Sequence, residues 1–459
     1  MAGKYQSYNS YKSSEIESID QIPSHWEEIP LKYVATCNDD VLPENTDRDY
    51  EFHYIDISSV SKTSGIETTE LVKFGSAPSR ARRLVKDGDV IVSTVRTYLE
   101  AIAPIEKNHQ GMVASTGFAV IRPTQIESSY AQYALRDRRF IDEVVARSTG
   151  VSYPAINASD LIRIATILPP RDEQRSIAAF LEHETAKIDT LIEKQQQLIK
   201  LLKEKRQAVI SHAVTKGLNP DAPIKDSGVE WLGEVPEHWE VTKLYHCTSQ
   251  IGDGLHATPS YEDATSHYFI NGNNLANGVI RTSSAREVSL SEYNKHFIEL
   301  DDNSLLLSIN GTIGNVAFYN NEKVILGKSA SFINCLSLLK REFLYLYLQS
   351  DHVAEYYNLE RTGTTIFNLS LNSIRQMAIG LPSTDEQCEI IDYCHHKLDR
   401  LNRLIDKSKK VVSLLKERRT ALISAAVTGK IDVRNWQPQS ATDMQPETTT
   451  EPVATPATH

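Results

Sequence analysis

Apolar residues recur at spacings of three, four and seven along two long segments of the chain, residues 172–214 and 385–427. This heptad pattern, with charged residues at most other positions, predicts two amphipathic helices that each bury one seam of apolar side chains. A helix of this length would extend about 60 Å at 1.5 Å per residue. Two such helices in one chain can bury their seams against each other.

The predicted seam takes roughly one residue from each helical turn. In the first helix these residues are Ile177, Leu181, Ile188, Leu191, Leu198, Leu202 and Val209. In the second they are Ile390, Leu401, Leu404, Val411, Leu415 and Leu422. Polar residues interrupt the seam, which fixes register at some cost in stability; they are Glu184, Gln195, Lys397 and Ser408.

The ends of both helices carry start and stop signals. Ser383 and Glu386 form a capping-box pattern at the start of the second helix. Glycine follows each helix, at Gly217 and Gly429, where the left-handed conformation that ends many helices is easily adopted.

The helices belong to a larger internal repeat. Trp26 and Trp239 lie 213 residues apart, and the same offset relates residues 149–150 to 362–363 and residues 172–174 to 385–387. A period of 213 residues is too long for a solenoid repeat. We therefore expect two copies of one domain, each followed by a long helix.

Each domain reads as mixed α and β, so the fold class is α+β. Short runs rich in β-branched residues, bounded by turn signals, predict strands. In the first copy these are residues 53–60, 90–95, 117–123 and 162–168; in the second they are 268–270, 305–309, 332–339 and 377–381. One helix is expected in each copy before a glycine stop, at residues 128–147 and 341–359.

Length and composition narrow the class of protein. A chain of 459 residues should hold two or three domains. The net charge of -11 argues mildly against a nucleic-acid binder, although binding depends on local patches. Five cysteines without a CxxC pair fit a reducing compartment. No apolar run approaches 18 residues and no signal-peptide core is present, so we expect a cytoplasmic protein without membrane contact.

The sequence contains no complete catalytic or metal-binding signature. Gly327, Lys328 and Ser329 match the end of a phosphate-binding loop, but Glu322 stands where its first glycine is required. No dinucleotide-type glycine motif, HExxH motif or defensible pair of carboxylates is present. Cys388 and its neighbours lack a zinc spacing. The domains therefore have the features of recognition domains rather than of enzymes. We assign no catalytic residue and no metal ligand.

Basic and polar loops are the candidates for contact with nucleic acid. Arginines and a lysine cluster before the strand expected at residues 90–95, and a cluster of this kind is either a solvated face or a set of contacts to phosphates and guanines. The matching loop of the second domain, residues 310–315, is neutral and rich in glycine, which is first of all a turn signal. The candidate DNA-binding residues are Arg80, Arg82, Arg83, Lys86, Ser93, Arg96, Tyr98, Ser308, Asn310, Thr312, Lys328, Arg361 and Thr364.

Several stretches of the chain resemble the DNA-specificity subunit of type I restriction–modification enzymes. They are KDSGVEWLGEVPEHWEV, the strand and loop pair KDGDVIVSTVR and DDNSLLLSINGTIGNVA, the helix starts LPPRDEQ and LPSTDEQ, and the helix end KERRTALISAAVTGKI. The resemblance covers nearly the whole chain except its two ends. The first copy departs from the pattern at residues 15–20, where the second has Gly228, Trp231 and Gly233.

The resemblance implies a specific architecture and set of partners. Two target-recognition domains with pseudo-twofold symmetry are separated by two long helices packed as an antiparallel coiled coil. Each domain reads one half of a bipartite site in double-stranded DNA, and the helices set the spacer and dock two methyltransferase subunits. Restriction/translocase subunits complete the complex. S-adenosylmethionine, ATP and Mg²⁺ are then expected on partner subunits and none on this chain, which is itself not catalytic. Expected contacts with partner subunits are Trp26, Trp239, Lys203 and Lys416.

The resemblance and the repeat together predict the domain boundaries. They are a disordered start (residues 1–11), recognition domain 1 (12–170), the central helix (171–217), recognition domain 2 (218–383), the distal helix (384–431) and a disordered tail (432–459). Two other interpretations stay open at this point. One is the specificity subunit of a type IIB-like or methylation-only system. The other is a coiled-coil scaffold with two protein-binding domains and no role in DNA binding.

Overall fold

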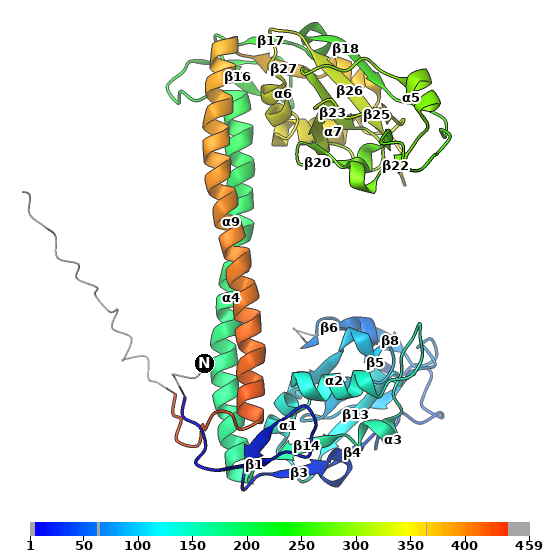
Figure 1. Ribbon diagram of the computed structural model, residues 1–459, viewed down its shortest axis with the longest axis vertical. Helices are drawn as coiled ribbons and strands as arrows, with labels where there is room; N and C mark the ends of the chain where they lie inside the picture. The colour runs from blue at the N-terminus through cyan, green and yellow to red at the C-terminus, as the bar shows by residue number, and fades with distance from the viewer. Residues whose placement is uncertain (1–4, 62–64, 364, 439–459) are drawn as a thin grey trace, which may run out of the picture. The chain divides into compact units, whose positions relative to one another are not determined.

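The computed structural model describes residues 5–61, 65–363 and 365–438. Their contacts divide the chain into two compact units. Unit 1 comprises residues 1–194 and 411–459, and unit 2 comprises residues 195–410. Each unit contains one mixed α/β domain and one stretch of each long helix (Figure 1).

Two four-stranded sheets form the domain of unit 1. The first is antiparallel and has the order β11 (Ile102–Pro104), β10 (Val90–Ser93), β13 (Phe118–Pro123) and β4 (Ala35–Cys37). The second has the order β8 (Glu70–Lys73), β5 (Glu51–Ile55), β12 (Val113–Ser115) and β9 (Ala81–Leu84), with β5 and β12 parallel. The remaining elements are the pairs β1 (Tyr11–Ser13) and β2 (Gln21–Pro23), β3 (Glu27–Pro30) and β14 (Ala165–Leu168), and β6 (Val60–Ser61) and β7 (Gly65–Ile66), with helices α1 (Ser128–Ala134), α2 (Arg138–Ala146) and α3 (Ala158–Leu161).

Unit 2 repeats this topology. Its antiparallel sheet has the order β24 (Val316–Phe318), β23 (Ser304–Ser308), β26 (Ala330–Cys335) and β18 (Thr248–Asp253). A second sheet again contains a parallel pair, in the order β22 (Arg286–Glu287), β19 (Tyr268–Ile270) and β25 (Val324–Leu326). The remaining elements are the pairs β15 (Ile224–Asp226) and β16 (Glu234–Pro236), β17 (Glu240–Lys243) and β27 (Ala378–Leu381), and β20 (Leu275–Ala276) and β21 (Val279–Ile280), with helices α5 (Leu290–His296), α6 (Arg341–Tyr347), α7 (Asp351–Glu360) and α8 (Leu371–Gln376). The duplication predicted from the sequence is therefore confirmed in the fold.

The single helix expected before each glycine stop is in fact two helices. The break falls between α1 and α2 in unit 1 and between α6 and α7 in unit 2. Asp137 begins α2 by accepting a hydrogen bond from the backbone N–H of Arg139, and Ser350 begins α7 by accepting one from Val353. A capping side chain at the same repeat position thus starts a second helix inside each continuous apolar pattern.

The two long helices match their predicted bounds closely. They are α4 (Arg171–Lys216) and α9 (Thr384–Val427). Ser383 caps α9 as expected, because its hydroxyl accepts a hydrogen bond from the N–H of Glu386. Gly217 and Gly429 have φ of +73° and +71°, which confirms them as helix stops.

The helices run antiparallel within each unit. In unit 1, Ile177 near the start of α4 shares a buried core with Val427 at the end of α9, and Arg419 donates a hydrogen bond to Asp189 at 2.9 Å. In unit 2, Ala213 near the end of α4 shares a core with Ile390 near the start of α9. The expected antiparallel packing is therefore present in both units.

The seam between the helices is partly different from the predicted one. Leu191, Leu198, Leu404 and Val411 were assigned to it but are 40–48% exposed. The seam instead uses the neighbouring residues Ile192, Ile199, Ile405 and Val412. The error is the same in both copies, since apolar residues occupy two adjacent positions there and spacing alone cannot choose between them. Of the predicted interruptions, Gln195 and Ser408 do lie on this seam, three residues after Ile192 and Ile405.

The two ends of the described chain are packed, which corrects the expectation of disorder for residues 5–11 and 432–436. Tyr8 is 4% exposed, and the backbone N–H of Asp432 donates to the carbonyl of Gln6 at 2.7 Å. The ring of Trp436 lies 5.3 Å from that of Phe180 on α4. Both segments are mostly polar, which is why disorder was predicted. Their tyrosine and tryptophan rings nevertheless supply enough apolar surface to pack against the unit. Residues 1–4 and 439–459 lie outside the described residues.

Replacing Ile188 by alanine should lower the free energy of unfolding of unit 1 by about 2–5 kcal/mol, because the truncation leaves a cavity in the buried seam. The same truncation at Leu191, which is 48% exposed, should cost less than about 1 kcal/mol. Urea titration monitored by circular dichroism measures both variants. A larger loss at Leu191 than at Ile188 would show that the helices pack through the other face.

Candidate functional site

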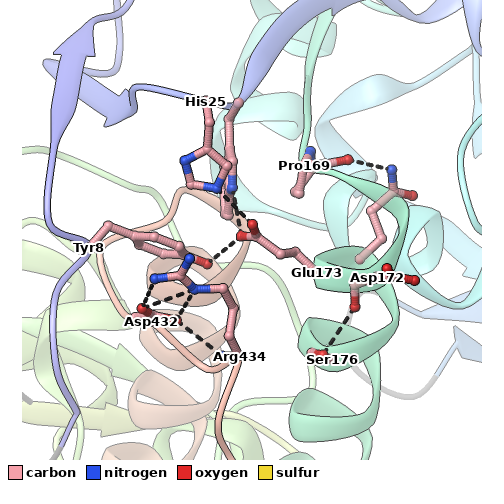
Figure 2. Close-up of polar contacts among 10 residues, drawn as sticks. Tyr8, His25, Pro169, Asp172, Glu173, Ser176, Asp432 and Arg434 are labelled. Carbon is pink, nitrogen blue, oxygen red and sulfur yellow. Dashed lines mark hydrogen bonds and ion pairs between the residues drawn. The ribbon is translucent and has the colours of Figure 1, made fainter.

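A buried carboxylate joins the start of α4 to the N-terminal segment of unit 1. Glu173 accepts hydrogen bonds from the hydroxyl of Tyr8 at 3.0 Å and from the indole N–H of Trp26 at 2.9 Å, and its other oxygen lies 2.6 Å from Nε2 of His25 (Figure 2). Burial, and then the charge of Glu173, raises the pKa of Tyr8. The carboxylate also sits in the first turn of α4, where the helix dipole favours a negative charge.

A salt bridge closes this cluster from the C-terminal side. Figure 2 shows Arg434 beside Tyr8 and bonded to Asp432. Its guanidinium lies 4.9 Å from the centre of the Tyr8 ring, and its Nη2 lies 2.6 Å from the Asp432 carboxylate. The pKa of Asp432 is lowered because the hydrogen bonds from Arg434 outweigh the effect of burial. The two chain ends of unit 1 therefore meet on the same anchor.

The next residue of the motif ties the helix start to the domain. Gln174 accepts a hydrogen bond from the backbone N–H of Glu127 at 2.8 Å and donates one to the carbonyl of Pro169 at 2.7 Å. Glu127 is the residue before α1, so one amide side chain joins α1, the end of β14 and α4.

Unit 2 builds the same anchor from the repeated residues. Glu386 accepts from the indole N–H of Trp239 at 3.0 Å and lies 2.9 Å from Nε2 of His238. Gln387 accepts from the backbone N–H of Lys340 at 2.8 Å and donates to the carbonyl of Pro382 at 3.0 Å. The repeated His-Trp and Asp-Glu-Gln sequences are therefore the two halves of one structural joint.

This joint changes the interpretation of the two tryptophans, which were predicted to contact partner subunits. Trp26 is 0% exposed and Trp239 is 1% exposed, and both indoles are bonded inside their own unit. Lys203 and Lys416, which carry the same prediction, are exposed on the long helices. The lysines are therefore the better candidates for direct contact with another subunit, and that contact stays a prediction.

Two loops are locked together at one end of the antiparallel sheet of unit 1; they are residues 94–98, which follow β10, and residues 149–155, which follow α2. Thr149 and Ala155 close the second loop with two backbone hydrogen bonds of 2.9 Å. Ala155 also pairs with Val95 of the first loop. The exposed guanidinium of Arg96 lies 5.1 Å from the centre of the Tyr153 ring, across the two loops.

The corresponding loops of unit 2 are residues 309–313 and 362–368. Thr362 and Asn368 close the second loop with two hydrogen bonds of 2.9 Å, and Asn368 pairs with Asn310 of the first. The guanidinium of Arg361 lies 4.2 Å from the centre of the Phe367 ring. We call the pair of loops in each unit the loop frame.

Glycine is required at one position of both loop frames. Gly150 and Gly363 have φ of +110° and +99°. A Cβ at Gly150 would lie 3.2 Å from the carbonyl oxygen of Tyr153, and one at Gly363 would collide with that of Ile366 at 2.3 Å. The positive φ disfavours a side chain at both positions, and at Gly363 the available space excludes one as well, which accounts for the glycine in each repeat.

The predicted cluster of basic residues in unit 1 is divided by the structure. The backbone of Arg80 bonds to Thr116, next to Gly117, which bonds to Thr94, so Arg80 lies near the loop frame. Arg82 and Arg83 lie on β9; Arg82 packs on Phe74 at 4.9 Å, and Arg83 pairs with Ala114 in the sheet. Lys86 lies beyond the far end of β9 and forms an ion pair with Asp40 at 2.6 Å. The pKa of Asp40 is lowered, chiefly by the hydrogen bond from Lys86 and next by the hydrogen bond from Arg122.

The other candidate residues differ in exposure. Ser93 and Ser308 are buried, and their hydroxyls donate to the carbonyls of Val95 and Thr312 at 2.6 Å, so they shape the loops rather than face solvent. Asn310 is half-buried and donates to the side chain of Asn368 at 3.3 Å. The exposed candidates are Tyr98, Thr312, Lys328 and Arg361. Thr364 lies outside the described residues.

Sequence reasoning missed the aromatic residues of the loop frames. Tyr153 and Phe367 follow the repeated Thr-Gly pair by three and four residues. The repeat pointed to these loops, but the residues within them differ between copies, so no shared pattern singled them out. Among the described residues, no group of three or more His, Cys, Asp or Glu is placed to hold a metal ion. No helix in the described ranges is both long and apolar enough to cross a membrane.

Replacing Glu173 by alanine should destabilise unit 1 by about 2–4 kcal/mol, because the buried donors of Tyr8 and Trp26 lose their shared acceptor. The neighbouring Asp172, whose side chain is 97% exposed, provides the matched control, and its truncation should cost less than about 1 kcal/mol. Chemical unfolding of both variants measures the difference. Equal losses would mean that the helix dipole, and not the joint, accounts for the effect.

The chain is similar to several specificity subunits. It is 22% identical over 444 residues to the type I restriction enzyme MjaVIII specificity subunit of Methanocaldococcus jannaschii. This alignment covers 94% of this chain and 98% of that protein. It is 22% identical over 362 residues to the EcoKI specificity subunit of Escherichia coli, covering 76% of this chain and 75% of that protein.

Solved structures share the fold. A chain from a structural study of the assembly and conformational transition of the type I R-M system superposes with a TM-score of 0.70 at 21% identity, covering 89% of this chain and 99% of that one. The crystal structure of an HsdS subunit from Thermoanaerobacter tengcongensis gives a TM-score of 0.50 at 20% identity, covering 91% of this chain and all of that one.

The family model of the type I restriction modification DNA specificity domain matches residues 23–201 and 260–413, one match for each copy of the internal repeat. These matches cover most of the chain. The chain therefore belongs to the family of type I restriction–modification DNA-specificity proteins.

Proposed function

We propose that this chain is the DNA-specificity subunit of a type I restriction–modification complex, in which each unit reads one half of a bipartite site in double-stranded DNA. The observation that carries the proposal is the duplicated loop frame. Its closing hydrogen bonds and its glycine are the same in both units, whereas its exposed side chains differ.

A constant frame with different contents suits the reading of two different short sequences. Contacts to phosphates position a protein on DNA, but side chains that reach base edges in the grooves distinguish one sequence from another. In unit 1 the exposed side chains of the second loop include Val151 and Tyr153, and in unit 2 they include Ile366. Two units with the same support and different side chains can therefore recognise two different half-sites.

The long helices connect the proposed function to partner subunits. Each helix contributes to both units, so its length bears on how far apart two half-sites can lie. We infer that the helices set the spacer and that Lys203 and Lys416 face the two methyltransferase subunits. The chemistry belongs to the partners: methyltransferase subunits with S-adenosylmethionine, and restriction/translocase subunits with ATP and Mg²⁺. The chain itself acts without catalysis, in the cytoplasm.

The net charge of -11 is compatible with this role. The affinity of a DNA-binding protein depends on the charge near the duplex, and partner subunits can supply part of the phosphate contact. The described carboxylates of unit 1 are also partly neutralised; Asp89 and Asp40, for example, bond Arg122 at 2.8 and 2.5 Å.

Exchanging residues 30–168 for the matching segment of a relative should change one half-site and leave the other and the spacer unchanged. The exchanged segment carries both four-stranded sheets and the loop frame of unit 1 but leaves both long helices in place. The chain is co-expressed with its methyltransferase subunit, and methylated adenines are mapped by sequencing. A parent that methylates no split site would refute the proposed function, and a change in both half-sites would refute independent reading.

Inserting four residues after Gln195 in α4, and four after the equivalent Ser408 in α9, should lengthen the spacer by one or two base pairs. The insertions add about 6 Å to each helix at 1.5 Å per residue, which corresponds to roughly two base pairs at 3.4 Å each. Four residues are close to one helical turn, so the seam is displaced only slightly. Mapping of methylated sites compares this variant with the parent. An active variant with the parental spacer would show that the helices do not determine the spacing.

A further inference from the structure

Each loop frame holds an arginine against an aromatic ring in an exposed position. In unit 1 the guanidinium of Arg96 lies on Tyr153, which is 65% exposed; in unit 2 that of Arg361 lies on Phe367. Among the ion pairs of the described residues none involves Arg96 or Arg361, and nearby Glu100 and Glu342 pair instead with Arg138 and Arg341. Both arginines are thus oriented by a ring while their N–H donors stay available to a ligand.

The two contacts are built from different positions of the repeat. Aligning the strand ends VIVS of β10 and LLLS of β23 places Arg96 opposite Gly311. Arg361 lies opposite Ser148, and Phe367 lies opposite Pro154. Because the arginine comes from the first loop in unit 1 and from the base of the second loop in unit 2, the contact is not a packing detail that duplication copied. The contact is therefore built from non-equivalent residues in the two frames.

The backbone conformation of Arg96 is strained for a residue that has a side chain. Arg96 has φ +51°, in the left-handed region, and the equivalent Gly311 has φ +74°. Glycine meets the needs of this turn without strain, whereas a residue with a Cβ is disfavoured there. Such strain at an exposed position motivates the hypothesis that the side chain itself has a role.

We propose that the Arg96–Tyr153 and Arg361–Phe367 contacts are the base-reading elements of the two half-sites, each presenting a guanidinium edge to O6 and N7 of a guanine in the major groove. The inference rests on the proposed function and names the residues that perform it. Guanine offers two acceptors on one edge, which matches the forked donors of an arginine. The ring beneath restricts the guanidinium plane before DNA arrives, and this restriction lowers the ordering cost of binding.

Arg96→Gly is the decisive variant for unit 1, because it removes the side chain and also relieves the backbone strain. It should fold at least as stably as the parent. In the complex with the methyltransferase subunit, it should reduce discrimination at a single base pair of one half-site by about 5- to 150-fold and leave the other half-site unchanged. Arg361→Ala should do the same in the other half-site. Arg96→Lys should not restore the preference, since an ammonium group lacks the two-pronged geometry.

Two further cation–aromatic contacts provide matched controls outside the loop frames. Lys32 lies 4.7 Å from the ring of Tyr33 in unit 1, and Arg286 lies 3.4 Å from that of Tyr261 in unit 2. Lys32→Ala and Arg286→Ala should leave both half-sites as in the parent. Equal relaxation in these controls would overturn the assignment, because it would mean that loss of any exposed cation lowers specificity.

The remaining outcomes separate the inference from the proposed function. A parent complex that methylates a split site, together with unchanged specificity in Arg96→Gly and Arg361→Ala, would overturn the inference alone. A uniform loss of affinity over all sequences, with a salt dependence reduced by about one phosphate contact, would identify the arginines as phosphate ligands and also overturn base reading. A parent that methylates no split site would end both.

Discussion

The structure of each unit depends on one carboxylate at the start of a long helix, which is buried in unit 1 (Glu173) and half-buried in unit 2 (Glu386). Glu173 and Glu386 collect the donors of a His-Trp pair that lies about 150 residues earlier in the chain, and in doing so they fix where the helix leaves the domain. A buried charge is costly unless it is well hydrogen-bonded, and here indole and imidazole groups satisfy it while the helix dipole favours it. Together with the neighbouring Gln174 or Gln387, this joint ties each long helix to the domain that precedes it.

The joint of unit 1 has one hydrogen bond more than that of unit 2, and the additional bond comes from the N-terminal segment. Glu173 receives an additional hydrogen bond from Tyr8, whose ring in turn carries Arg434. In unit 2 the segment before His238 follows directly from α4, so the chain itself holds it in place. In unit 1 no peptide bond joins the end of α9 to the start of β1. In unit 1, side chains from both ends of the described chain hold the segment before His25 in place. In unit 2 the covalent connection to α4 does this.

Much of this architecture was predictable from the sequence, because the features concerned are repeated or periodic. The offset of 213 residues, the bounds of α4 and α9, and their glycine stops all follow from local patterns. The breaks before α2 and α7 were missed because a capping residue can interrupt a helix without interrupting its apolar periodicity. Leu191 and Leu404 were assigned to the seam because adjacent apolar residues make the spacing ambiguous. The loop frames were only partly predictable: Arg96 stands out by charge, but Tyr153 becomes relevant only when the fold brings the two loops together.

The closed loop frame has a consequence for how such a protein changes over generations. Backbone hydrogen bonds and a glycine hold each frame at its base, while the side chains at its tip are surrounded by solvent. Substitutions at exposed positions of this kind usually alter the free energy of unfolding by no more than about 0.5 kcal/mol. The exposed residues of each loop can therefore be exchanged one at a time at little cost in folding stability. Such variants stay above the stability threshold below which mutants are lost by selection. Where these tip residues read DNA, as we propose, new target preferences can be sampled in single steps while the scaffold stays intact.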